Sequence, residues 1–386
     1  MYTLEDGGPS IPTRAFLVGV SLGGEPVETV EEHLQELGEL VTSCGGQVLG
    51  ETLQRRHTPD AATFVGKGKA EEIGVAAREL GAEVVVFDDD LSPSQVKNLE
   101  KVTDLAVMDR SSVILEIFSN RARSRESKTQ VELARLNYLL PRLTRRWSHL
   151  SRQAGGIGVR GGEGESQLEA DRRMLRTRIR HLERDLVTIE RTRALQRRAR
   201  QRVPTVALAG YTNAGKSTLF NRLTHAGVHA EDRLFATLDA RLRRGALDPR
   251  HVVVFADTVG FIRKLPHHLV SSFRSTLEEI TEADQVLHVV DRSHPAWRDQ
   301  LAVADEVLDS LDVDPERVLV VFNKIDALGG EPVPSSADAG RDAVYVSAVT
   351  GEGLDRLRAR LLERLYPEDA ARAAALAAEW AAQASS

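Results

Sequence analysis

The feature that most constrains this chain is a glycine-containing octapeptide between an apolar run and a helix-like segment: Gly210-Tyr211-Thr212-Asn213-Ala214-Gly215-Lys216-Ser217. The apolar residues 206–209 predict a strand before it, and Ser217-Thr218-Leu219-Phe220 opens a helix. A strand–GxxxxGK[ST]–helix sequence is typical of a phosphate-binding P-loop, in which glycines let backbone N–H groups surround an anion. The helix N-terminus adds positive potential. We therefore expect Lys216 to reach the terminal phosphates, Ser217 to offer its hydroxyl to Mg²⁺, and residues 210–218 to bind nucleotide. The motif alone leaves open an ordinary glycine turn before a helix.

A second motif indicates which base is bound. Asn323-Lys324-Ile325-Asp326 follows the apolar run 318–322, and ligands bind at the carboxyl ends of strands in open α/β sheets. The Asp326 carboxylate can accept two donors from the edge of guanine, whereas adenine would leave this acceptor unpaired at a cost of roughly a few kcal/mol. Asp326 therefore favours GTP over ATP. We expect the base to be supported from its other side by Ser347-Ala348-Val349, which follows another strand-like run.

Two further elements lie between these motifs. Asp257-Thr258-Val259-Gly260 follows the apolar residues 252–255, so Asp257 is the expected Mg²⁺ acid and the Gly260 N–H is free to meet a γ-phosphate. Thr237 is the candidate switch threonine, and its neighbours in the same nucleotide-binding loop are Phe235, Ala236 and Leu238. The order of the four elements predicts a P-loop GTPase. Its catalytic residues would be Lys216, Thr237 and Gly260, and its Mg²⁺ residues Ser217, Thr237 and Asp257.

The residue after Gly260 is Phe261, where signalling GTPases place a glutamine that orients the attacking water. Phenylalanine cannot orient water by hydrogen bonding. We therefore predict weak intrinsic turnover, on the order of 10⁻⁴ s⁻¹ as in an unassisted small GTPase, that a partner accelerates. A turnover of about 1 s⁻¹ by the isolated chain would contradict this prediction.

These motifs, together with Gly161-Gly162-Glu163-Gly164-Glu165-Ser166-Gln167-Leu168-Glu169 upstream, resemble the HflX family of ribosome-associated GTPases. The resemblance covers roughly residues 14–366. The family usually has threonine where Ser166 stands. Many members also carry an additional C-terminal domain, whereas this chain is expected to have only an Ala-rich tail there. The resemblance implies that the N-terminal and helical regions bind the large ribosomal subunit near the peptidyl-transferase region, and that ribosomal subunits are separated.

Charge is distributed unevenly along the chain. The net charge is −6, yet residues 121–202 hold 22 Lys/Arg against 9 Asp/Glu, an excess of 13 that leaves −19 for the rest. Such asymmetry favours an anionic partner for this segment, and its arginine content favours RNA over a merely solvated helix face. No DNA partner is expected, and nothing in the sequence requires a dimer. One cysteine, no apolar stretch of 18 residues and an acidic start predict a cytoplasmic protein without membrane insertion.

The remaining patterns predict the domain organisation. Alternating strand-like and helix-like runs indicate an α/β domain with a parallel sheet over 1–125. Apolar stripes at helical spacing in residues 126–140 and 166–202 predict a basic helical hairpin over 126–202, whose connection is glycine-rich. The P-loop GTPase domain, with a mostly parallel sheet, is expected over 203–366, and an Ala-rich tail over 367–386. Ser111 is expected to cap a helix. A glycine-lysine loop, Gly66-Lys67-Gly68-Lys69, and an acidic cluster, Asp88-Asp89-Asp90, are both expected near strand ends and leave open a second nucleotide site in the first domain.

The main functional hypothesis is a GTP hydrolase that binds the large ribosomal subunit and its RNA, and couples GTP turnover to separation of subunits or rescue of stalled ribosomes. A GTP-gated RNA- or ribosome-binding regulator without splitting activity is the alternative from another class. An ATP-dependent RNA remodeller working through the N-terminal domain is disfavoured, because no second nucleotide motif is complete.

Overall fold

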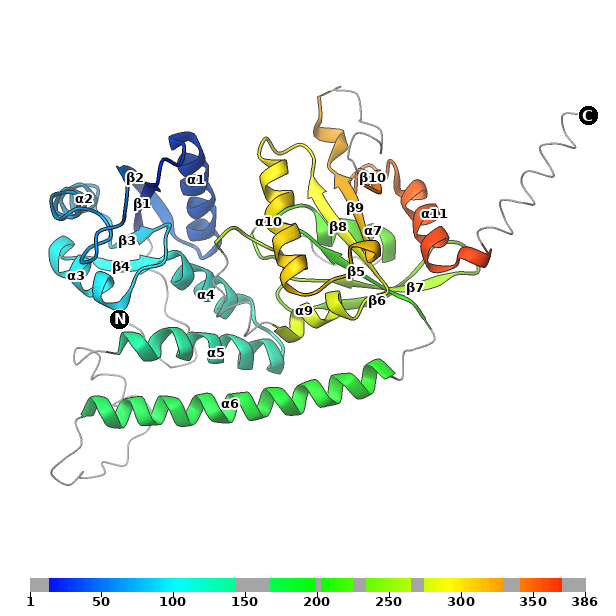
Figure 1. Ribbon diagram of the computed structural model, residues 1–386, viewed down its shortest axis with the longest axis horizontal. Coiled ribbons are helices and arrows are strands. Elements are labelled where there is room, and N and C mark those ends of the chain that lie inside the picture. Colours follow the sequence, from blue (N-terminus) through cyan, green and yellow to red (C-terminus); the bar gives the residue numbers. More distant parts are fainter. Residues whose placement is uncertain are drawn as a thin grey trace, which may run out of the picture. The chain divides into compact units, whose positions relative to one another are not determined.

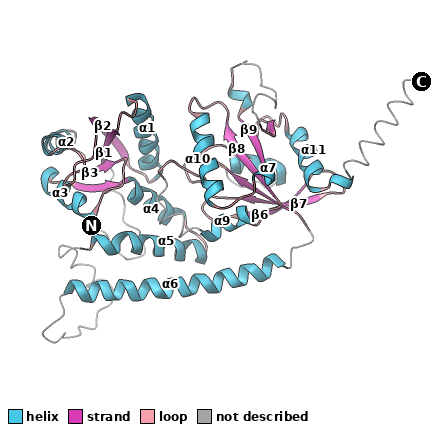
Figure 2. Cartoon of the chain, viewed as in Figure 1, coloured by secondary structure: helices cyan, strands magenta, loops and turns pink. Residues whose placement is uncertain are grey.

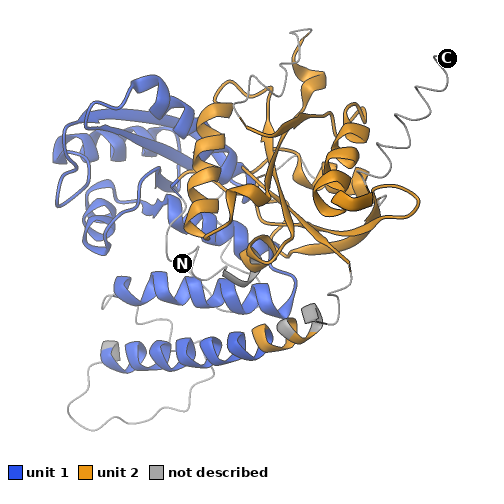
Figure 3. Cartoon of the chain, turned by 45° about the vertical axis from the view of Figure 1, so that its right-hand side comes forward, with its two compact units in different colours: residues 1–189, 264–272 blue, residues 190–263, 273–386 orange. Residues whose placement is uncertain are grey.

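The computed structural model describes residues 14–143, 167–198, 203–224, 234–264, 274–329 and 341–369. Its contacts divide the chain into two compact units, one of residues 1–189 and 264–272 and one of residues 190–263 and 273–386 (Figure 3). The glycine-rich connection, Ser166 and most of the Ala-rich tail lie outside the described residues. In the described part of the chain, no helix combines the length and apolar content that a bilayer crossing needs.

The first unit contains a four-stranded sheet of order β2-β1-β3-β4 in which every neighbouring pair is parallel, as predicted. Helices α2 and α3 lie on one face of this sheet and α1 and α4 on the other (Figure 1). The elements are β1 (Arg14–Leu22), α1 (Val27–Ser43), β2 (Gln47–Arg56), α2 (Lys67–Glu79), β3 (Val84–Phe87), α3 (Pro93–Thr103), β4 (Ala106–Asp109) and α4 (Arg110–Arg121).

Strand β1 is buried on both faces, as expected for a parallel sheet covered by helices. Phe16 and Val18 belong to the core beneath α2 and α3. On the opposite face, a Cβ at Gly19 would lie 3.0 Å from the side chains of Leu34 and Val30 on α1. Glycine at this position therefore lets α1 pack closely on the strand.

Two local expectations in this unit are wrong. The helix that was expected to be capped by Ser111 begins two residues earlier than such a cap requires, because the Asp109 carboxylate accepts from the Ser112 N–H at 2.9 Å and forms the cap. Ser111 instead donates its hydroxyl to Asp90. The segment 66–69 is the start of α2 rather than a loop, with Gly66 at its N-cap.

The helical pair is formed by α5 (Arg125–Leu139), followed by η1 (Leu140–Arg142), and the long α6 (Gln167–Arg198). The division between the two units falls within α6, after Ile189. Apolar side chains from both helices form a seam of four buried and three partly buried residues: Leu133, Leu136, Ile179 and Leu182, with Leu140, Leu175 and Leu186. Above the seam, the Arg178 guanidinium donates to both carboxylate oxygens of Glu132 at 2.7 and 2.8 Å.

The second unit contains a six-stranded sheet of order β10-β9-β8-β5-β7-β6, parallel except for the antiparallel pair of β6 and β7 (Figure 2). Its strands are β5 (Thr205–Ala209), β6 (Arg241–Ala246), β7 (Val252–Asp257), β8 (Gln285–Asp291), β9 (Val318–Asn323) and β10 (Ala343–Tyr345). Its helices are α7 (Lys216–Thr224), α9 (Arg274–Thr281), α10 (Trp297–Ser310) and α11 (Leu354–Leu365), with the short η4 (Pro315–Arg317) and η5 (Ile325–Ala327).

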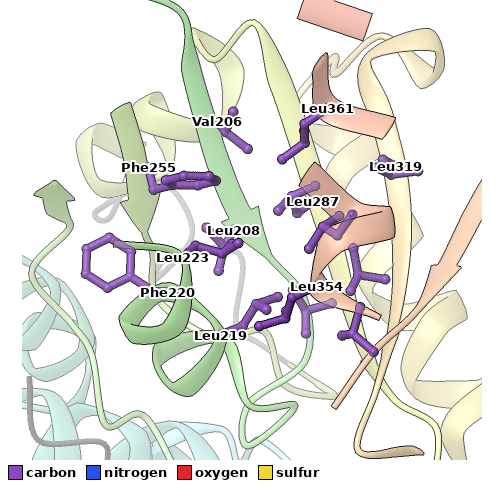
Figure 4. Close-up of a cluster of buried hydrophobic side chains, with 14 of the residues drawn as sticks. Val206, Leu208, Leu219, Phe220, Leu223, Phe255, Leu287, Leu319, Leu354 and Leu361 are labelled. Atoms are coloured by element: carbon purple, nitrogen blue, oxygen red, sulfur yellow. The ribbon is translucent and has the colours of Figure 1, made fainter. Parts of the chain in front are cut away.

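The main core of this unit lies between the sheet and helices α7 and α11 (Figure 4). Leu219 and Phe220 of α7 pack there against Leu208 of β5 and Phe255 of β7. Replacing a buried phenylalanine such as Phe220 by alanine costs about 3–5 kcal/mol of stability. The first turn of α7 is therefore held firmly at the carboxyl end of the sheet, where the phosphate-binding motif lies.

Candidate nucleotide-binding site

The loop between β5 and α7 has a backbone that two of its glycines make possible. Gly210 has φ +139° and Gly215 has φ +88°, conformations that residues with side chains rarely adopt. A Cβ at Gly210 would collide with the Val289 carbonyl, and one at Gly215 with the Asn323 side-chain amide. The loop therefore lies tightly against the ends of β8 and β9, and both glycines are required by space as well as by φ.

Lys216, the first residue of α7, turns its side chain back into this loop. Its ammonium donates to the carbonyls of Gly210 at 3.0 Å and Tyr211 at 2.7 Å. The side chain is buried, and burial lowers the pKa of Lys216 to about 8, partly opposed by the charge of Asp257. A buried cation whose partners among the described residues are neutral carbonyls is well suited to bind an anion, because an anion would offset the cost of its desolvation.

Three oxygen-bearing side chains meet beside the lysine: Ser217, Thr237 and Asp257. The Ser217 hydroxyl donates to Asp257 Oδ2 at 2.8 Å, the Thr237 hydroxyl donates to the same oxygen at 2.9 Å, and the two hydroxyls are 3.0 Å apart. Burial raises the pKa of Asp257, and the hydrogen bond from Ser217 opposes that rise. Asp257 Oδ1 is buried without a hydrogen-bond partner among the described residues.

This set of residues fits a Mg²⁺ ion. Magnesium prefers hard oxygen ligands and is usually bound by one or two carboxylates together with substrate phosphates and water. The described residues contain no group of three or more His, Cys, Asp or Glu side chains that could hold a metal by themselves. One carboxylate and two hydroxyls next to a phosphate-binding loop are consistent with a metal that arrives with the nucleotide.

The segment after Asp257 is joined to the phosphate-binding loop through its backbone. The Thr212 N–H donates to the Phe261 carbonyl at 2.6 Å, and the Phe261 N–H donates to the Gly210 carbonyl at 3.0 Å. A Cβ at Gly260 would lie 2.8 Å from Thr212 Cα, so only glycine allows this approach. Phe261 itself is 1% exposed, so its ring packs in the interior.

The remaining predicted residues around the phosphate end also lie close together. Thr258 donates its hydroxyl to the Leu208 carbonyl at 2.7 Å, and Val259 is buried. The loop of Thr237 is anchored by the Phe235 N–H, which donates to the Thr212 hydroxyl at 2.9 Å. The other members of the predicted set lie in the same two loops and in the first turn of α7, with various exposures: Asn213 and Thr218, and Ala236 and Leu238.

At the other end of the site, Asn323 links two loops. Its amide nitrogen donates to the Ala214 carbonyl at 3.0 Å, and its amide oxygen accepts from the Ala348 N–H at 3.0 Å. The buried Asn323 thereby holds the phosphate-binding loop and the loop after β10 at a fixed distance from each other. Asp326, in η5, is exposed, so its carboxylate is accessible to a base.

Neighbouring residues hold the segment around Asp326 in place. Lys324 has a left-handed backbone and pairs with Asp291 at 2.7 Å, while Ile325 is buried. The buried Ser347 accepts the Thr350 N–H at 3.0 Å, which shapes the loop after β10. The next residue but one, Val349, is 62% exposed.

Some contacts of the site were not predicted. Tyr211 accepts the Arg263 N–H on its hydroxyl at 3.0 Å, which joins the phosphate-binding loop to the segment after Phe261. Arg222 donates to the carbonyl of Ala348 at 3.0 Å. Asp291 ends β8 and could have been found by the same strand-end reasoning that identified Asp326. The partners of Tyr211 and Arg222 depend on tertiary contacts that no local pattern indicates.

The fold and this geometry define the class of the second unit as a P-loop nucleotide-binding domain with a guanine-type base motif. Family models match most of the chain: "GTP-binding GTPase N-terminal" over residues 31–119, "GTP-binding GTPase Middle Region" over 121–200 and "50S ribosome-binding GTPase" over 205–324. The chain is 47% identical over 352 residues to GTPase HflX of Magnetococcus marinus, covering 91% of this chain and 82% of that protein. It is 48% identical over 341 residues to GTPase HflX of Escherichia coli, covering 87% and 80%.

The chain belongs to the HflX family of GTPases, which confirms the resemblance found in the sequence. It is a GTP hydrolase. Among solved structures, a GTP-binding protein from Sulfolobus solfataricus in complex with GDP is similar at 23% identity and a TM-score of 0.47, covering 91% of this chain and 98% of that chain.

Proposed function

We propose that this GTPase binds the large ribosomal subunit through its RNA, and couples GTP binding and hydrolysis to separation of ribosomal subunits or rescue of stalled ribosomes in the cytoplasm. The proposal is supported by the match of residues 205–324 to a family described as "50S ribosome-binding GTPase", and by the positive charge concentrated in residues 121–202. We also propose the division into an N-terminal domain (1–125), a basic helical hairpin (126–202), a GTPase domain (203–366) and a tail (367–386), and a monomeric protein.

The roles of the site residues follow from their contacts. Lys216 exchanges its two carbonyl partners for phosphate oxygens, the Gly260 N–H meets the γ-phosphate, and Asp326 accepts the donors of guanine. Ser217, Thr237 and Asp257 are the residues that would hold Mg²⁺. When bound, this ion neutralises the charge that develops on the phosphates. Loss of the γ-phosphate would release the loop of Thr237 and the segment after Asp257.

The position of Phe261 is the observation which indicates that hydrolysis needs a partner. Its side chain is buried and its backbone is bonded to the phosphate-binding loop, so the residue after Gly260 cannot orient the attacking water. We infer that the ribosome supplies or positions the missing group. Hydrolysis would then be slow until the protein is on its partner.

The test is GTP turnover by the purified chain, with and without large ribosomal subunits, followed by sedimentation of 70S particles to detect separation. Stimulation of at least about 100-fold is expected, since partner-supplied groups raise GTPase rates by about 10³–10⁵. Stimulation without separation would favour the GTP-gated regulator. Absence of stimulation would refute the proposal.

An ATP-dependent remodeller acting through the first domain receives less support. Asp88, in the acidic cluster at the end of β3, is nearly fully buried and accepts from the Arg110 guanidinium at 2.6 Å. Lys67 and Lys69 lie in the first turn of α2 beside Glu71 and Glu72. The carboxylate of Asp88 is thus already paired inside the domain, and both lysines have acidic neighbours on their own helix.

A further inference from the structure

The outer face of α6 carries a row of arginines in the part of the helix that belongs to the first unit. Arg173, Arg176, Arg180 and Arg184 are all exposed. Spacings of three and four residues place them on one side of the helix, with successive charges about 6 Å apart along its axis. The seam that packs on α5, which includes Ile179 and Leu182, lies on the opposite side.

Helix stability does not explain this row. Arg176 has Arg172 four residues before it, Arg173 three residues before it and Arg180 four residues after it, and Arg180 is followed at the same spacing by Arg184. Like charges at these spacings destabilise a helix. No acidic side chain among the described residues forms an ion pair with Arg176, Arg180 or Arg184.

A neighbour on the same helix shows the contrast. Arg178 lies outside the row, and its guanidinium donates to both carboxylate oxygens of Glu132 on α5. That arginine links α6 to α5, whereas Arg176, Arg180 and Arg184 are exposed and form no ion pair within the described residues. Arg180 donates to the neutral hydroxyl of Thr177 at 3.2 Å. A feature that costs helix stability and makes no internal ion pair at three of its four positions is best explained by an external anion.

We propose that this arginine row, Arg173, Arg176, Arg180 and Arg184, docks on the phosphate backbone of double-helical RNA. Guanidinium groups bind phosphate through two parallel hydrogen bonds. Residues 167–198 contain no Phe, Tyr or Trp, so this helix lacks the aromatic platforms that bind single strands by stacking. The choice of RNA over DNA rests on the proposed function.

The form of the helix supports a duplex as the ligand. Helix α6 has 32 residues and so extends about 48 Å at 1.5 Å per residue, which allows a straight row of charges to follow a backbone across several nucleotides. Val187, three residues after Arg184, is 46% exposed and adds apolar surface for contact with sugars at one end of the row.

The test compares binding of the full-length chain to a short RNA duplex over a range of salt concentrations. The variant R173Q/R176Q/R180Q/R184Q should bind at least about tenfold more weakly at low salt, and the magnitude of the slope of log affinity against log salt should fall by about 3.6, as expected for the loss of four phosphate contacts. The control variant R243Q/R244Q/R250Q/R356Q removes the same charge from exposed positions of the second unit and should bind like the wild type. Circular dichroism and GDP affinity check that both variants fold.

Other results would overturn the inference. An unchanged slope in the row variant, or an equal loss in the control variant, would reduce the effect to net charge. Equal binding of a DNA duplex of the same sequence would overturn the assignment to RNA, and binding of polyglutamate without binding of RNA would indicate an acidic protein instead. A separate measurement tests the proposed function. If that function is wrong, large ribosomal subunits will leave the GTP turnover of the wild-type chain unchanged, whether or not the chain binds the RNA duplex.

Discussion

Affinity for GDP should fall as pH rises above about 8, because Lys216 loses its proton in the free protein. Lys216 is 6% exposed, and burial lowers its pKa to about 8. Bound phosphates favour the charged form and raise this pKa again. Below pH 8 the lysine is charged in both states, whereas above pH 8 the free protein must take up a proton when nucleotide binds.

The magnitude follows from the pKa of about 8 in the free protein. If the bound lysine stays protonated, affinity at about pH 8.5 is about fourfold weaker than at pH 7, and at about pH 9 it is about tenfold weaker, since each pH unit above the pKa costs about 1.4 kcal/mol. Affinity should be nearly independent of pH between about pH 6.5 and pH 7.5.

The assay is a titration of a fluorescent GDP analogue at constant ionic strength across this range. The control is Lys216→Arg, whose guanidinium stays charged throughout. Ionisation of the guanine ring would weaken nucleotide binding by both proteins alike. The comparison therefore concerns how affinity changes with pH in each protein, and not their absolute affinities. A flat profile for the wild type, or the same fall in both proteins, would refute the reasoning.

Three further changes test other parts of the structure. Asp326→Asn should shift preference from GTP toward xanthosine triphosphate by at least about tenfold in a competition assay, because the amide reverses one donor–acceptor match; unchanged preference would contradict the base assignment. Gly260→Ala, whose Cβ would lie 2.8 Å from Thr212 Cα, should lower GTP turnover at least about tenfold while GDP still raises the melting temperature, and full turnover would exclude this role. Burial raises the pKa of Glu116 to about 7, so its contribution to stability declines as pH rises from about 4.5 to 7. Glu116→Gln should therefore be about 1–2 kcal/mol more stable than wild type at pH 8 in urea unfolding, and a difference equal at pH 5 and pH 8 would rule out this explanation.

The parts of the fold that depend on local pattern could be predicted from the sequence. Strands β3, β5 and β9 lie on apolar runs of the sequence, because parallel strands covered on both faces require continuous apolar residues. The edge strands β2 and β6 contain many polar residues, so no apolar run marks where they end. The pairing of α5 with α6 followed from the spacing of Leu175, Ile179 and Leu182, and these side chains do lie in the seam. Glycines at 210 and 215 indicated the anion-binding loop through a requirement that is local to the backbone.

Features that depend on distant partners could not be predicted. Asp109 and Ser111 are both good helix caps, and the choice between them depends on where β4 ends and on Asp90, which accepts the Ser111 hydroxyl. The same holds for Tyr138, whose hydroxyl donates to the buried Asp109 at 2.8 Å although the two residues are far apart in the sequence. Contacts of this kind follow from the packing of helices on a sheet, which a single sequence does not specify.

The buried position of Phe261 also determines how this GTPase can be studied with nucleotide bound. In GTPases that have glutamine after the Asp-x-x-Gly motif, replacing that side chain slows hydrolysis and leaves the loops in place, because the glutamine acts on water. Here a substitution at position 261 would remove a core ring next to the backbone bonds to Gly210 and Thr212, so it would disturb nucleotide affinity before it revealed anything about turnover. A form that retains GTP is better sought at Thr237, whose hydroxyl reaches Asp257, so genetic dissection of the cycle should begin there.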